Sequence, residues 1–213
     1  MLFRSHGNVF GAVKFFQEAK KHGLKPVLGC EMYLTPDVAI KDSQSKYHHL
    51  IVIVQNRQGY QNLCRLMAYS YQEGFYFKPR IDYAALEKYH EGLIISTACL
   101  GGHIPSLLRH GKQEEAEKWI KWGLDVFGRE RFFLELMPTD LDVAGLENSE
   151  QGNKQLITNQ RLMEAGKKLG ADCITTGDAH YLCEADHEAH EVLLSIQTKH
   201  LISDPKDRKS TRL

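Results

Sequence analysis

Hydrophobic residues recur along this chain in two alternating patterns. Apolar residues three or four positions apart, such as Val9, Val13 and Phe16, predict helices that are buried on one face. Short apolar runs rich in β-branched residues, such as residues 50–54, predict buried strands. The predicted helices cover residues 9–21, 59–71, 83–89, 101–108, 114–127, 155–169 and 185–196. The predicted strands cover residues 27–34, 50–54, 92–99, 132–136 and 173–177.

The alternation of strands and helices predicts an α/β fold with a parallel sheet, because βαβ units place successive strands side by side in one direction. Five predicted strands are too few for a closed eight-stranded barrel. An open sheet and an incomplete barrel therefore remain as alternatives. No linker, low-complexity tract or internal repeat divides the sequence, so we expect one compact unit.

Composition narrows the class of protein. The 213 residues include 27 basic and 27 acidic side chains, so the net charge is zero and does not by itself indicate a nucleic-acid-binding protein. With 42% hydrophobic residues the chain can bury a core, which excludes a largely disordered protein. No apolar run approaches the ~18 residues of a membrane span. Five cysteines without a Cys-x-x-Cys pair indicate free thiols in a reducing cytoplasm.

Ionisable side chains gather near the ends of the predicted strands. They are Glu31, Cys99, Asp178 and His180 near strand ends, with His6 before the first helix and His49 before the strand at 50–54. Because the carboxyl ends of parallel strands meet at one edge of a sheet, we expect these groups to lie together. Carboxylate, thiol and imidazole ligands suit zinc, and carboxylate-rich parts of the set also suit manganese or magnesium.

Each of these residues also has a structural explanation. His6 could lie in a turn, His49 could be a hydrogen-bonded structural histidine, and Cys99 could be a small buried apolar residue. Asp178 could simply orient His180, since residues two apart in an extended segment point the same way. A carboxylate within an apolar run is harder to explain structurally, because it is rarely buried without a partner.

Several ordered motifs together resemble a known family. They lie at residues 6–13, 25–31, 49–56, 59–63, 74–82, 91–94, 99–105 and 189–197. They are similar to the PHP (polymerase and histidinol phosphatase) domain, in the version at the start of bacterial replicative DNA polymerase III alpha subunits. The resemblance covers residues 6–205.

The resemblance implies a distorted seven-stranded βα barrel of the PHP type. It also implies a cluster of up to three metal ions at the strand ends, commonly zinc or manganese. The metal ligands would be His6, Glu31, His49, Cys99, Asp178 and His180. Glu31 would bridge two ions, and Glu31 and Asp178 would act in catalysis through the bound metals.

The sequence also departs from the family pattern. The family begins with a strand that carries a His-x-His pair, which is not present here. We therefore expect a partial PHP domain at residues 6–205, with residues 1–5 and 206–213 as truncation edges or foreign sequence. The resemblance then implies a barrel that lacks its first strand. Such a fragment would fold poorly by itself and would be inactive.

The resemblance implies a part of the replicative polymerase of a bacterial cytoplasm, whose DNA synthesis would use magnesium at a site outside this sequence. This region would hydrolyse phosphoesters, as a 3′→5′ proofreading exonuclease. Implied partners are primer–template DNA, the sliding clamp and an exonuclease subunit, with no membrane. A freestanding phosphatase of the histidinol-phosphate type and a non-catalytic structural or docking module are the alternatives. Lys78 and Arg80, beside the aromatic residues 75–77, could contact a DNA strand end or pack on a neighbouring region.

Overall fold

Seven strands form one sheet in the computed structural model, which describes residues 2–42, 47–138, 150–181, 183–199 and 201. The strands are β1 (Leu2–His6), β2 (Val27–Leu34), β3 (His48–Val54), β4 (Arg80–Ile81), β5 (Leu93–Ser96), β6 (Phe132–Leu136) and β7 (Asp172–Thr175). The predicted strands at 27–34 and 132–136 are confirmed with the same bounds. The sequence analysis missed β1 and the two-residue β4.

The predicted helices are all present, with ends that differ by a few residues. They are α1 (Ala12–Lys21), α2 (Arg57–Gln72), α3 (Tyr83–Lys88), α4 (His103–Arg109), α5 (Gln113–Phe127), α6 (Glu150–Leu169) and α7 (His187–Thr198). The predicted buried stripe of α1 was wrong in part. Ala12 and Ala19 are buried, whereas Val13 is 59% and Phe16 41% exposed.

The strand order is β1-β2-β3-β5-β6-β7, and β4 pairs with the end of β2. The prediction of a parallel sheet was wrong for β3, which runs antiparallel to both β2 and β5. A parallel pair needs a long crossover, usually a helix, and no described helix lies between β2 and β3. An α/β sheet of seven strands is thus established. The described strand pairs do not join β1 to β7.

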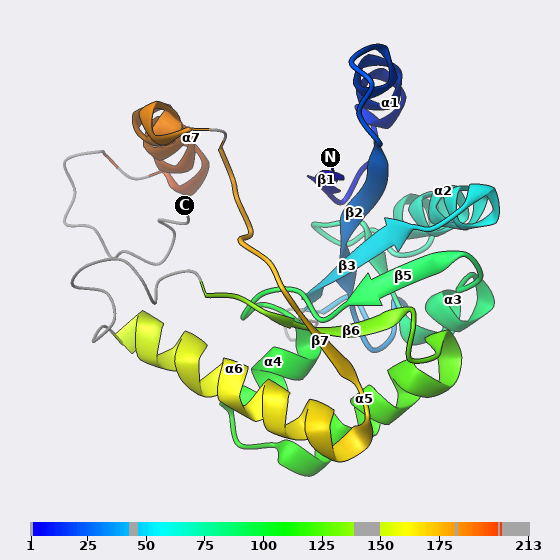
Figure 1. The fold of residues 1–213 in the computed structure, drawn as a ribbon, viewed down its shortest axis with the longest axis vertical. Helices are drawn as coiled ribbons and strands as arrows, with labels where there is room; N and C mark the ends of the chain where they lie inside the picture. The colour runs from blue at the N-terminus through cyan, green and yellow to red at the C-terminus, as the bar shows by residue number, and fades with distance from the viewer. Residues whose placement is uncertain (1, 43–46, 139–149, 182, 200, 202–213) are drawn as a thin grey trace.

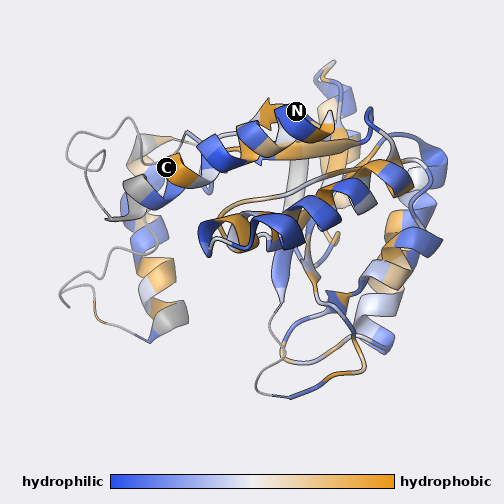
Figure 2. Cartoon of the chain, turned by 90° about the horizontal axis from the view of Figure 1, so that it is seen from below, coloured by the Kyte–Doolittle hydropathy of each residue, from blue (hydrophilic) through white to orange (hydrophobic). Residues whose placement is uncertain are grey.

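The core lies between the central strands and the helices that cover them. Met32, Val52, Ile95 and Leu134, from four neighbouring strands, are at most 1% exposed. Figure 1 shows α4, α5 and α6 gathered along one side of the sheet, with α1 and α7 apart from that group. Hydrophilic and hydrophobic residues alternate along the helices (Figure 2), as expected for helices with one face on a core.

The two ends of the sequence differ in how far the structure describes them. Leu2–His6 forms β1 and pairs in parallel with β2, so residues 2–5 belong to the sheet. Residues 206–213, the expected second edge, lie outside the described residues. Across the described part of the chain, none of the helices has the length and apolar character needed to cross a membrane.

Candidate metal centre

The register of the sheet places Glu31 between two histidines. His6 is the direct neighbour of Glu31 across β1 and β2. Ile51 is its neighbour across β2 and β3, so His49, two residues earlier, projects from the same face as Glu31. The Glu31 carboxylate lies 3.4 Å from His6 Nε2 and 2.9 Å from His49 Nδ1. This carboxylate is buried, with 4% of the residue exposed.

Cys99 reaches His49 through a tight turn after β5. Ala98 has a φ of 59°, in the left-handed region that turns the chain sharply, and Cys99 Sγ lies 3.3 Å from His49 Nδ1. The His49 backbone N–H donates to the Gly101 carbonyl at 3.0 Å and fixes this turn against β3. Continuous contacts thus join four residues, which we call the Glu31 cluster: His6, Glu31, His49 and Cys99.

His49 is the electrostatic centre of the Glu31 cluster. Burial by itself would lower the pKa of His49, because it disfavours the charged imidazolium. Hydrogen bonds to Cys99 and Glu31 outweigh burial and raise the pKa to about 9. The contacts with Glu31 and Cys99 therefore favour the charged imidazolium form of His49.

Asp178 and His180 follow β7, which is the last strand in the order of the sheet, whereas His6 and Glu31 lie on the first two strands. Asp178 is buried and has a φ of 47°, so the chain turns at this residue. His180 Nδ1 donates to the Asp178 backbone carbonyl at 2.7 Å, which leaves Nε2 as the nitrogen with a lone pair. The ring centre of His180 lies 5.9 Å from that of His6.

The donors fit a divalent metal by their chemistry, since zinc and related ions take imidazole, thiolate and carboxylate ligands. The side chains of the Glu31 cluster contact one another directly. Within the residues that the structure describes, no three His, Cys, Asp or Glu side chains stand ready to hold one ion as they are. Metal binding would therefore replace the His–Glu and His–Cys contacts by bonds to the ion.

Sequence analysis missed one carboxylate close to these residues. Glu135 lies in β6 and is 2% exposed. It accepts hydrogen bonds from Ser96, from the Ala98 backbone and from Thr176. A charged residue inside the apolar run of residues 132–136 was the signal that could have revealed it.

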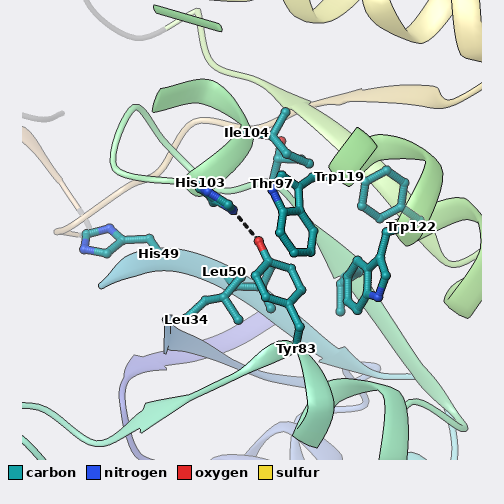
Figure 3. A pocket seen from close by; sticks show the side chains of 11 residues that line it. Leu34, His49, Leu50, Tyr83, Thr97, His103, Ile104, Trp119 and Trp122 are labelled. Atoms are coloured by element: carbon teal, nitrogen blue, oxygen red, sulfur yellow. Dashed lines mark hydrogen bonds between the residues drawn. The ribbon is translucent and has the colours of Figure 1, made fainter. Parts of the chain in front are cut away.

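A second group of aromatic residues lies beside His49 and encloses a cavity (Figure 3). Tyr83 stacks on Trp119 with ring centres 3.8 Å apart, and its hydroxyl points to His103 Nδ1 and shares a hydrogen bond with it. The cavity volume is about 20 Å³, which is room for a water molecule but not for a nucleotide. This aromatic group therefore packs as part of the core. It consists of Tyr83 on α3, His103 on α4 and Trp119 on α5.

We expect the chain to lose stability as the pH falls from 7 to 4.5, because His103 takes up a proton more readily in the unfolded chain than in the folded chain. Burial first, and then the neighbouring His48, lower the pKa of His103 from 6.5 to about 4. The unfolded chain therefore takes up this proton first, and stability present above pH 6.5 is lost as the pH falls towards 4. Urea denaturation should show on the order of 2 kcal/mol more loss from pH 7 to pH 4.5 for wild type than for His103→Gln. An equal loss in the two proteins would contradict this assignment.

The aromatic–basic loop before β4 does not present the predicted pair of cations. Arg80 is fully buried, and its guanidinium donates to backbone carbonyls of Gly74, Ile40 and Val38. Of the two alternatives for this loop, contact with DNA through Arg80 was wrong, because a buried guanidinium that binds three carbonyls cannot reach a phosphate. Lys78 lies over the ring of Tyr33, 5.5 Å from its centre.

The comparison with protein families matches residues 2–139 to the PHP domain. The chain belongs to the PHP domain family. Its relatives include the DNA polymerase III subunit alpha of Borreliella burgdorferi, 40% identical over 197 residues, which are 91% of this chain and 16% of that protein. The subunit of Aquifex aeolicus is 40% identical over 208 residues, which are 93% of this chain and 17% of that protein. The subunit of Thermus aquaticus is 38% identical over 206 residues, which are 94% of this chain and 16% of that protein.

These matches define how much of the relatives this chain represents. This chain spans about one sixth of the length of each polymerase subunit that it matches. The similarity reaches well beyond residue 139, where the family match ends, because it covers more than nine-tenths of the chain.

Proposed function

We propose that this PHP domain is a metal-dependent phosphoesterase-type region of a bacterial replicative DNA polymerase III alpha subunit. The observation that carries the proposal is the buried carboxylate of Glu31, which lies between His6 and His49. Cys99 adds a thiol to this group through its contact with His49. Three strands and a strained turn contribute to this arrangement. Burial of ionisable groups and backbone strain both cost free energy of folding, which favours a functional role for the site. The similarity to polymerase III alpha subunits supports the parent protein.

Six side chains would hold the metal ions, which we propose to be zinc or manganese: His6, Glu31, His49, Cys99, Asp178 and His180. Bound divalent ions would polarise a phosphoester and lower the pKa of a bound water. Glu31 has two oxygens that already face different histidines, so it is suited to bridge two ions.

The chain itself contributes orientation and a dry environment. The His180 hydrogen bond to the Asp178 carbonyl fixes the ring and leaves Nε2 available as a ligand. Glu31, Cys99 and Asp178 are buried, so their charge would act at low dielectric on a bound ion. His6 is exposed, so a substrate could reach it from solvent.

The proposed substrate is the 3′-terminal nucleotide of a DNA strand, removed as proofreading. Primer–template DNA, the sliding clamp and an exonuclease subunit are the proposed partners of the parent protein, in the bacterial cytoplasm. Polymerisation would take place outside this domain, at a magnesium site elsewhere in the parent protein.

Replacement of Asp178 by asparagine tests the proposal. The chain, extended by the family's first strand with its His-x-His pair, is loaded with Mn²⁺ or Zn²⁺, and metal content and release of 3′-terminal nucleotides from a mismatched primer are measured. We expect Asp178→Asn to lower both affinity and release between about 10- and 100-fold, because it removes an ionic ligand. Asp172→Asn is the matched control, since Asp172 lies in β7, the strand that leads to Asp178, but forms an exposed ion pair with Arg129.

The outcomes separate three functions. Nucleotide release that Asp178→Asn lowers by the expected factor, with folding intact, supports the exonuclease. Metal binding without release of nucleotide supports a structural or docking module instead. Hydrolysis of histidinol phosphate, without action on DNA, supports the freestanding phosphatase, and a wild-type chain that binds no metal contradicts the proposal.

A further inference from the structure

We propose that Glu135 is a positioning residue that sets the ends of β5 and β7 and so places Cys99 and Asp178 relative to each other. This inference rests on the proposed metal centre. Glu135 lies in β6, between the two strands whose ends carry these residues. It touches neither proposed ligand in any hydrogen bond described above, so it would act through the backbone.

Glu135 holds the segment that leads to Cys99 at three points. Its Oε2 accepts from Ser96 Oγ at 2.5 Å and from the Ala98 backbone N–H at 3.1 Å. Its own backbone N–H donates to Thr97 Oγ1 at 2.9 Å. Ala98 is the residue with a left-handed φ, a conformation that costs energy for a residue with a Cβ. The bond to the Ala98 N–H therefore stabilises the turn that points Cys99 at His49.

The other carboxylate oxygen of Glu135 holds the segment that leads to Asp178. Oε1 accepts from Thr176 Oγ1 at 2.5 Å. Thr176 directly follows β7 and lies two residues before Asp178, which also has a left-handed φ. One buried carboxylate thus fixes two strand ends that are 80 residues apart in sequence, and each leads into a strained residue at or next to a proposed ligand.

Two substitutions separate the geometry of Glu135 from its charge. Glu135→Gln keeps an oxygen for Ser96 and Ala98, and its amide can donate to the Thr176 hydroxyl, which can rotate to accept. Glu135→Leu has a similar size but leaves the Ala98 N–H without its acceptor. The matched structural control is Asp82→Asn, because Asp82 is also a buried carboxylate that bonds a backbone N–H and a hydroxyl, but at α3.

The test uses Co²⁺ as a spectroscopic probe in the full 213-residue chain. We expect Glu135→Leu to lose thiolate-to-cobalt charge-transfer absorption and to bind Co²⁺ about 10- to 100-fold more weakly. Glu135→Gln should restore the wild-type spectrum, and Asp82→Asn should keep it. A wild-type spectrum in Glu135→Leu would overturn the inference. If Glu135→Leu does not fold, Thr176→Val removes only the β7 contact and should weaken Co²⁺ binding without loss of the thiolate band.

A metal-free measurement distinguishes failure of this inference from failure of the proposed function. Alkylation of Cys99, followed by peptide mass spectrometry, should be about tenfold faster in Glu135→Leu, because the turn opens more often. Cys30, fully buried on β2, is the internal control and should keep its rate. A wild-type chain that binds no Co²⁺ would contradict the metal centre alone. Unchanged Cys99 alkylation in Glu135→Leu would contradict the role of Glu135 whether or not metal binds.

Discussion

Glu31→Gln is expected to weaken metal binding to this PHP domain by at least about 100-fold, more than any other single substitution in the proposed centre. Loss of a partner that only orients a ligand already costs about 10- to 100-fold in metal affinity. Glu31 does more than that, because its two oxygens face His6 and His49 on opposite sides. Glutamine removes the negative charge and places an amide group, which is a poor ligand, toward one of the histidines. Titration with Zn²⁺ against a competing chelator measures the change.

A surface pair provides the control for Glu31→Gln. Glu18 lies 3.3 Å from His22 on the exposed side of α1, so Glu18→Gln also breaks a Glu–His contact but far from the strand ends. We expect its metal affinity to equal that of wild type. If Glu31→Gln and Glu18→Gln retain the same affinity, the Glu31 cluster is not the metal centre.

The direction of β3 explains why the candidate residues meet although the topology was predicted incorrectly. In a wholly parallel sheet, His49 at the start of its strand would lie at the edge opposite to the carboxyl ends that carry the other residues. Because β3 runs antiparallel, its amino end lies at the same edge as Glu31 and Cys99. Hydrophobic periodicity predicts where a strand lies and which residues share a face, but not its direction.

Backbone conformations set the remaining part of the centre, and these were beyond the sequence pattern. Cys99 and Asp178 depend on left-handed residues, Ala98 and Asp178 itself, and neither residue type signals that conformation as glycine would. A long-range contact to Glu135 stabilises the turn at Ala98, and another holds Thr176 in the segment before Asp178. Glu135 is the clearest case, since its three partners lie about 40 residues away on either side in the sequence.

The partners of buried charged residues could be predicted only in part from the sequence. Glu31 within an apolar run was correctly singled out as a carboxylate that needs partners, and the structure shows it in contact with two histidines. For Arg80 the sequence left two alternatives, contact with DNA or packing on a neighbouring region, because it lies among aromatic and basic residues. An Arg is rarely buried without partners, and its partners here are backbone carbonyls, which no sequence pattern identifies.

Arg80→Met is therefore expected to destabilise the chain by about 3–5 kcal/mol, the largest loss of stability among these substitutions. Methionine keeps the length of the side chain but donates no hydrogen bond. The carbonyls of Gly74, Ile40 and Val38 would each lose a charged donor at 3.0 Å, and the bonds to Gly74 and Val38 are buried. These bonds tie the segment after β2 to the end of α2 and to β4, so their loss should also loosen the connection between β2 and β3. Urea denaturation at pH 7 measures the change.

Arg129→Met is the matched control, because Arg129 also makes two short hydrogen bonds, to Asp172, but its side chain is 66% exposed. Exposed ion pairs contribute at most about 1 kcal/mol, so this substitution should leave the midpoint nearly unchanged. A cost for Arg80→Met no larger than that for Arg129→Met would show that water or other donors replace the guanidinium. The contrast compares a buried guanidinium that bonds backbone carbonyls with an exposed one that bonds a carboxylate, so a larger cost for Arg80→Met would show that the exposed ion pair is the weaker contribution.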